Sequence, residues 1–126
     1  MIKEEIQTVS APAAIGPYSQ GISTEQMVFI SGQLPVNPQT GEFDSQDVAA
    51  QTKRVLENVV EVLKATGLST QHVVKTTVFL QSMDDFAAMN EGYASYFTQP
   101  FPSRSTIAVA ALPKGAKVEI EVIAVR

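Results

Sequence analysis

The order of predicted elements indicates an α+β protein in which two helices pack on one β-sheet. β-branched segments occupy both ends of the chain, two segments repeat apolar residues at helical spacing, and a further β-branched segment lies between them. The chain has 126 residues, of which 44% are hydrophobic and 17% are charged. That size and composition fit a single folded domain over residues 1–126 with a core of its own.

The N-terminal part is predicted to form short strands. Residues 2–9 form the first, and residues 11–17 are a loop punctuated by proline and glycine. Residues 18–23 and 27–31 then form two strands around a tight turn. Consecutive strands joined this closely are expected to pair.

The first helix has the clearest local pattern. Asp44 or Ser45 is expected to cap its N-terminus, and Gly67 is expected to end it. The residues at helical spacing are Val48, Thr52, Val55, Leu56, Val59 and Leu63. Their spacing predicts one buried helix face.

The second helix is predicted to follow a strand at 73–80. Ser82 begins a segment that resembles a capping box, and the prolines at 100 and 102 end the helix. The apolar residues expected on one face are Phe86, Met89, Tyr93 and Phe97. These aromatic side chains are typical of core packing.

The last two strands are predicted at 104–110 and 117–125. Two helices cover one face of a sheet only, and several strands are apolar at both alternating positions. An apolar sheet face left open usually marks an association surface. We therefore expect a homo-oligomer whose sheets pack on one another.

Composition excludes several kinds of protein. The chain has no cysteine, so disulfides, thiolate metal sites and cysteine nucleophiles are excluded. The formal net charge is −4 and the pI about 4.9, which argues against nucleic acid as the main partner. The N-terminus has no apolar signal segment, and no apolar run is long enough to span a membrane. We expect a soluble, cytoplasmic protein without a membrane partner.

Arg104 is the most informative residue, because it stands in an apolar strand and its charge requires a partner. Alternation places Glu119 and Glu121 on one face of the last strand. If the two final strands are antiparallel neighbours, Arg104 and these carboxylates share a face. One interpretation is a structural salt bridge, which the pattern alone favours. The other is an arginine that binds a substrate carboxylate, with a nearby Glu as general base or acid.

Two glycine-containing segments, residues 16–21 and 31–35, are also unusual. Tyr18 and Ser31 offer neutral hydrogen-bonding groups, and Gly32 lets a ligand approach the backbone closely. Ordinary turns explain the same composition. Asn90, in the second helix, is by itself expected to be solvated.

Several separated motifs, taken together, resemble the RidA (YjgF) family. They are residues 11–21, the Ser-Gly-Gln at 31–33, Val-Lys-Thr-Thr-Val-Phe at 74–79, Pro-Ser-Arg-Ser at 102–105, and Leu-Pro-Lys at 112–114 followed by Val-Glu-Ile-Glu at 118–121. The resemblance runs over essentially the whole chain, in order.

The resemblance implies a chorismate-mutase-like α+β fold with a mixed β-sheet and two helices on one face. It implies a homotrimer with the sheets facing the trimer core and active sites in the clefts between subunits. The implied activity is that of a 2-iminobutanoate/2-iminopropanoate deaminase. Such an enzyme hydrolyses reactive enamines and imines, released by pyridoxal-phosphate enzymes, to 2-keto acids and ammonia. The resemblance implies neither a cofactor nor a metal.

Site residues follow from the same resemblance, motif by motif. The family's carboxylate-binding arginine falls on Arg104, and its water-activating glutamate falls on Glu119. The remaining expected substrate-binding positions are Tyr18, Ser31, Gly32, Asn90 and Thr106. Many family members have cysteine where this chain has Thr106, so a thiol-based role is excluded here.

Three other functions stay open. The first is a non-catalytic trimer that binds small carboxylates and regulates a partner, because the same arginine would suffice. The second is chorismate mutase chemistry, which is expected to need more cationic side chains. The third is a ribonuclease or translation inhibitor, which the acidic pI and the absence of a basic stripe support least.

Overall fold

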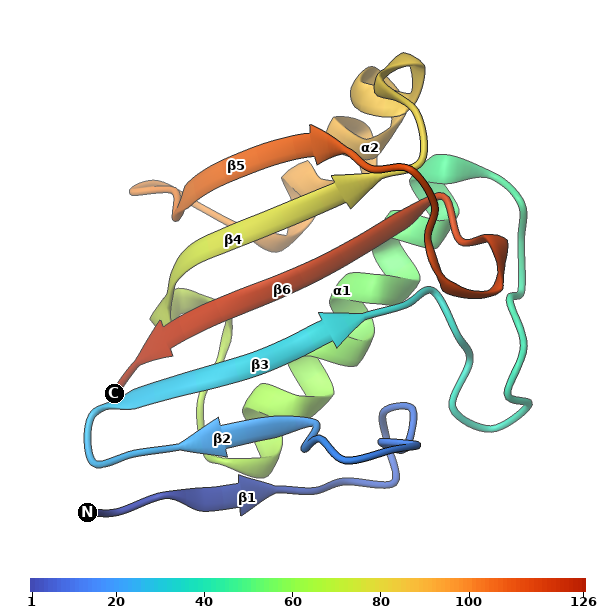
Figure 1. Ribbon diagram of the computed structural model, residues 1–126. Helices are drawn as coiled ribbons and strands as arrows, with labels where there is room; N and C mark the ends of the chain where they lie inside the picture. Colours follow the sequence, from blue (N-terminus) through green and yellow to red (C-terminus); the bar gives the residue numbers. More distant parts are fainter.

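The computed structural model describes all 126 residues and forms a six-stranded sheet with two α-helices on one of its faces (Figure 1). The strands are β1 (Glu4–Ile6), β2 (Gly21–Ser23), β3 (Met27–Gln33), β4 (Val73–Leu80), β5 (Ser103–Ala108) and β6 (Val118–Val125). The helices are α1 (Val48–Ala65) and α2 (Phe86–Tyr93). The predicted α+β class, with both helices on the same face, is confirmed.

The strand order across the sheet is β1-β2-β3-β6-β4-β5. All neighbouring pairs are antiparallel except β4 and β5, which are parallel, so the sheet is mixed. The hypothesis that β5 and β6 are antiparallel neighbours is wrong, because β4 lies between them. α2 connects β4 to β5, and a helical crossover of this kind returns the chain parallel to the strand it left.

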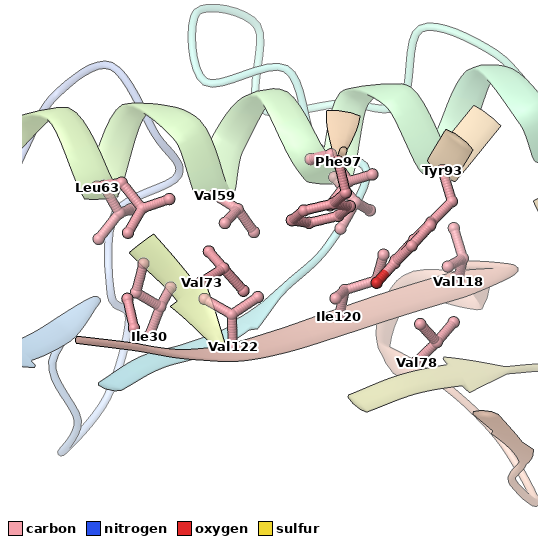
Figure 2. Close-up of a cluster of buried hydrophobic side chains, with 14 of the residues drawn as sticks. Ile30, Val59, Leu63, Val73, Val78, Tyr93, Phe97, Val118, Ile120 and Val122 are labelled. Carbon is pink, nitrogen blue, oxygen red and sulfur yellow. The ribbon is translucent and has the colours of Figure 1, made fainter. Parts of the chain in front are cut away.

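The core lies between α1, α2 and the covered face of the sheet (Figure 2). From the sheet it receives the inward-facing residues of β6, Val118, Ile120, Val122 and Ala124. From α1 it receives Val48, Val55, Leu56, Val59, Val62 and Leu63. Most of these helix residues were predicted from their spacing, and alternation along β6 was predicted to place Glu119 and Glu121 together on one face of that strand.

The N-cap of α1 is Asp47, whose carboxylate accepts a hydrogen bond from the Ala50 amide at 2.9 Å. The prediction of Asp44 or Ser45 as the cap is wrong. Both residues come too early for the first free N–H groups of the helix. Asp44 forms an ion pair with Arg54 at 3.2 Å instead. Gly67 follows the helix end with a φ of 80°, as expected for a glycine stop.

The second helical segment is longer than α2 alone. Ser82 caps a 3₁₀ turn at Met83–Asp85, which leads directly into α2, and a further 3₁₀ turn, Ala94–Tyr96, follows it. Its predicted apolar face is confirmed, since Met89, Tyr93 and Phe97 are buried.

The face of the sheet opposite the helices is open, and it is turned toward the viewer in Figure 1. Apolar side chains are exposed on it, as predicted: Phe29 is 40% exposed and Ile107 is 48% exposed. Neither helix, nor any of the short 3₁₀ turns, is long and apolar enough to cross a membrane.

Candidate functional site

Arg104 projects from the edge strand β5 toward the helix side of the sheet. Its register partner in β4 is Thr76, which in turn is paired with Val122 of β6, and both of these side chains are buried beneath the helices. Arg104 itself is partly buried. The guanidinium therefore lies at the rim of the core, beside α2.

No carboxylate neutralises Arg104. The two salt bridges of the structure join Arg54 to Asp44 and Lys64 to Glu61. Arg104 instead donates from Nη1 to Asn90 Oδ1 at 2.7 Å, and the same Nη1 lies 4.0 Å from Met89 Sδ. A guanidinium has five N–H donors, so Nε and Nη2 remain available for a ligand. The structure therefore contradicts the interpretation that Arg104 forms a structural salt bridge within its own chain.

Two aromatic rings complete the surroundings of Arg104. The guanidinium carbon lies 4.8 Å from the centre of the Tyr93 ring and 5.6 Å from that of Phe86, within the range of cation–π attraction. Tyr93 projects from α2 toward the sheet (Figure 2), where its hydroxyl lies 2.8 Å from Thr76 Oγ1. Burial raises the pKa of Tyr93 above its usual value, so the phenol stays neutral.

Glu119 lies on the opposite face of the sheet from Arg104. In β6 it alternates with the buried Ile120 and Val118. Its register partner in β4 is Phe79, on the open face. One chain therefore does not bring the two expected catalytic residues together, because the covered and open faces of the sheet separate them.

The environment of Glu119 makes its carboxylate a stronger proton acceptor than an ordinary one. Partial burial raises the pKa of its carboxyl above the usual value, and the negative charge of Glu121 adds to this shift. The Glu119 carboxylate can occupy its position only because residue 32 is glycine, since a Cβ on residue 32 would overlap it. A carboxyl with a raised pKa is suited to proton transfer near neutral pH.

Ser31 and Gly32 lie where the register between β3 and β6 shifts, in an irregularity between Ile30 and Gln33. Bulges of this kind re-aim side chains and are common next to active sites. Ser31 Oγ donates to the carbonyl oxygen of Ser19 at 2.6 Å. This bond ties the bulge to the segment that carries Tyr18, whose side chain is 53% exposed.

The expected site residues thus form two groups. The first, at β5 and α2, contains Arg104, Asn90 and Thr106. The second, on the open face at β3 and β6, contains Ser31, Gly32 and Glu119, and Tyr18 lies in the neighbouring loop, whose Ser19 is bonded to Ser31. Beside the second group the open face is hollowed by a cavity of about 390 Å³. Its polar lining residues are Ser19, Ser31, Lys75, Thr77 and Glu121.

Thr106 has a buried hydroxyl oxygen without a hydrogen-bond partner. Together with Asn58 Oδ1 it is one of two such side-chain atoms in the structure. It stands two positions after Arg104 in β5, on the same strand face. Buried polar groups are normally paired, so an unpaired one beside Arg104 is consistent with a ligand or water there.

Sequence reasoning missed the aromatic surroundings of Arg104. Phe86 and Tyr93 were assigned to core packing, and Asn90 was expected to be solvated. The missing signal was the spacing of 86, 90 and 93, which places all three on one side of α2. Only the position of β5 shows that this side of α2 faces Arg104. No group of three or more His, Asp or Glu side chains is placed to hold a metal ion.

Comparison with known proteins agrees with this fold and these motifs. A family model described as endoribonuclease L-PSP matches residues 8–126. The chain is 50% identical to the 2-iminobutanoate/2-iminopropanoate deaminase of Escherichia coli (strain K12), over 99% of either protein. It is 53% identical to the chloroplastic Reactive Intermediate Deaminase A of Arabidopsis thaliana; the match covers 97% of this chain but 65% of the plant protein.

Among solved structures, E. coli TdcF with bound serine superposes with a TM-score of 0.92 at 49% identity. The match covers 98% of both chains. The serine in that crystal structure shows that TdcF binds a small amino acid.

Proposed function

Because this chain belongs to the YjgF/RidA family, we propose that it is an enzyme that hydrolyses 2-iminobutanoate and 2-iminopropanoate to 2-keto acids and ammonia. Relatives at about 50% identity over nearly the whole chain are named for this activity. The observation that carries the proposal is Arg104, a strand arginine that no carboxylate of its own chain neutralises. It is ready to receive the carboxylate of an imino acid.

The reaction needs orientation and one activated water. Arg104 binds the substrate carboxylate through its free donors, as charge-assisted hydrogen bonds. Glu119 accepts a proton from water as the water oxygen adds to the imine carbon. Glu119 then gives this proton to the imine nitrogen, which completes the carbinolamine. The hydroxyl proton of the carbinolamine passes to the amino nitrogen, the C–N bond breaks to release ammonia, and the C=O bond forms. Holding water and imine in attack geometry supplies much of the rate.

The other expected site residues bind the substrate around these two. The backbone near Gly32 and Thr106 holds the imine nitrogen, Tyr18 and Ser31 line the open-face side, and Asn90 lies beside the carboxylate-binding arginine. No step uses a cofactor or a metal.

The proposed active unit is a homotrimer with a chorismate-mutase-like arrangement, in which the open sheet faces meet at the centre. This arrangement is supported by the separation of Arg104 and Glu119 onto opposite faces of one sheet. A complete site then needs Arg104 from one copy and Glu119 from the next. The exposed Phe29 and Ile107 would be covered in the same assembly. We expect the trimer to act in the cytoplasm on imines released by pyridoxal-phosphate enzymes.

The direct test couples a threonine dehydratase to this protein and follows imine decay by semicarbazone trapping. We expect the protein to shorten the imine lifetime and the Arg104→Ala variant to lose most of kcat/KM. Undiminished kcat/KM in that variant would contradict the mechanism. Saturable keto-acid binding without faster imine loss would instead favour the non-catalytic regulator.

Ribonuclease activity, which the description of the family model names, is a weaker candidate. Phosphate backbones bind basic surfaces, whereas this chain has a net charge of −4. A measured RNA affinity that falls steeply with salt would revive it.

A further inference from the structure

Within one chain, every hydrogen-bonding and cation–π partner of the Arg104 guanidinium is electrically neutral. Asn90 contributes an amide oxygen at 2.7 Å, Tyr93 and Phe86 contribute ring faces at 4.8 and 5.6 Å, and Met89 contributes a thioether sulfur at 4.0 Å. This is unusual for a partly buried arginine, which is normally paired with a carboxylate.

Neutral contacts have a different consequence from an ion pair. A carboxylate would hold the guanidinium in place, but it would also cancel its charge and compete with any incoming anion. An amide oxygen and aromatic faces attract the cation through their dipole and quadrupole, and they leave its net charge unchanged. The guanidinium can thus be held and remain attractive to a second carboxylate.

The contacts are also rigidly supported. Asn90 and Tyr93 lie on successive turns of α2, and Tyr93 is 7% exposed. The Tyr93 hydroxyl bonds Thr76 at 2.8 Å, and its ring packs against Phe97 with a centroid distance of 4.8 Å. Thr76 is the register partner of Arg104 itself. Thr76 of β4 therefore contacts the Tyr93 side chain and is also the strand neighbour of Arg104, so it positions both.

We propose that Phe86, Asn90 and Tyr93 form a neutral clamp, which orients the Arg104 guanidinium while its charge stays free for the carboxylate of a 2-imino or 2-keto acid. This rests on the proposed function and assigns these three residues as positioning residues that act through Arg104. It also gives Asn90 a role other than direct substrate binding.

Asn90→Asp tests the clamp with almost no change in shape. The variant places a carboxylate against Arg104 and neutralises it. We expect binding of 2-oxobutanoate, measured by titration calorimetry, to weaken about tenfold or more, because an ion pair now competes with the ligand. In the imine assay KM should rise while kcat changes much less.

Two controls separate charge from general damage. Ser95→Asp adds the same charge at an exposed position shortly after α2, and it should leave 2-oxobutanoate binding unchanged. The neutral analogue 2-oxobutanamide should bind Asn90→Asp and the parent protein equally. Equal 2-oxobutanoate affinity for Asn90→Asp and the parent protein would overturn the neutral clamp, as would an equal loss of both ligands.

Substitutions of Tyr93 test whether its aromatic ring contributes to the neutral clamp. Tyr93→Phe keeps the ring face but loses the hydrogen bond to Thr76, so KM should rise less than in Tyr93→Leu, which removes the ring. Equal KM values for a folded Tyr93→Leu and the parent would refute the aromatic contribution. If Tyr93→Leu does not fold, Asn90→Asp still decides the proposal.

Failure of the proposed function has a different signature. A protein that binds 2-oxobutanoate through Arg104 but does not hydrolyse imines would lose the deaminase proposal only, and the effect of Asn90→Asp on binding would remain. If Arg104→Ala leaves 2-oxobutanoate binding unchanged, the arginine is not the carboxylate anchor, and the neutral clamp fails with it.

Discussion

At the scale of single residues, the fold changes the pKa of the Glu119 carboxyl. Its carboxyl is partly buried on the open face, beside Glu121 and over Gly32. Burial is the larger cause of its raised pKa, and the charge of Glu121 is the smaller. Two separable effects therefore raise the pKa of one carboxyl, and a substitution of Glu121 removes the smaller of them.

We predict that the pKa of the Glu119 carboxyl, followed by NMR titration, lies above the ordinary value of 4.5. Glu121→Gln should lower that pKa, because it removes a like charge, but should leave it above 4.5, because burial persists. Glu61→Gln, on α1 at the other side of the sheet, serves as the control and should have no effect. An unchanged Glu119 pKa in Glu121→Gln would show that the two carboxylates do not interact.

Gly32 is predicted to matter through Glu119. In Gly32→Ala the new methyl group displaces the carboxylate, and kcat/KM should fall by about 10²-fold, since small misplacements have effects of that size. The double-mutant cycle with Glu119→Ala is the check. Once Glu119 is absent, adding Gly32→Ala should have little further effect. Additive losses would mean that Gly32 acts independently.

At the scale of elements, the contact between α1 and α2 fixes where α2 lies above β5. It depends on Gly92, where a Cβ would stand 2.5 Å from the Ala49 carbonyl oxygen and 3.0 Å from Thr52 Cβ. The Ala49 oxygen is a backbone atom of α1, so it cannot move away by a rotamer change as a side chain could. The close approach of the helices places α2, and with it Asn90, beside Arg104.

Gly92→Ala is therefore expected to destabilise the protein, although alanine is the better helix former. Separating the two helices should cost about 1–3 kcal/mol, partly offset by about 0.5–1 kcal/mol of helix propensity. Urea unfolding measures the difference. Ser95→Ala, at an exposed position, is the control. A stabilised Gly92→Ala protein would show that the helices have room to adjust.

At the scale of the whole molecule, one chain divides the proposed site residues into two separate groups. Arg104 and Asn90 lie at the helix side of edge strand β5, and Glu119 and Ser31 lie on the open face at β6 and β3. A head-to-tail ring of copies would bring an edge of one chain against the open face of the next.

Mixed oligomers test this arrangement directly. Arg104→Ala and Glu119→Gln should each be inactive alone. When they are co-expressed in equal amounts, about a quarter of the sites should regain both wild-type residues, because each site in a closed ring combines two neighbouring copies. Restored deaminase activity is the expected result. If both residues came from the same chain, no mixed site would be complete and the mixture would stay inactive.

The parts of the fold that depend on local pattern were predictable. The apolar faces of α1 and of the second helical segment, and the buried face of β6, follow from periodicities of 3.6 and 2. The cap of α1 was not predicted, because Asp44, Ser45 and Asp47 all have suitable side chains. Backbone geometry at the helix start selects among them.

The sequence by itself determined the alternation that places Ile120 and Glu119 on opposite faces of β6, the need of Arg104 for partners, and the motifs that identify the family. Only the tertiary structure decided that β5 pairs with β4, that Arg104 therefore meets α2, and that Glu119 faces away from it. The reason is physical: side-chain periodicity is set by neighbouring residues, whereas strand neighbours are set by how distant segments pack. That packing leaves Arg104 among neutral groups and apart from its own carboxylates.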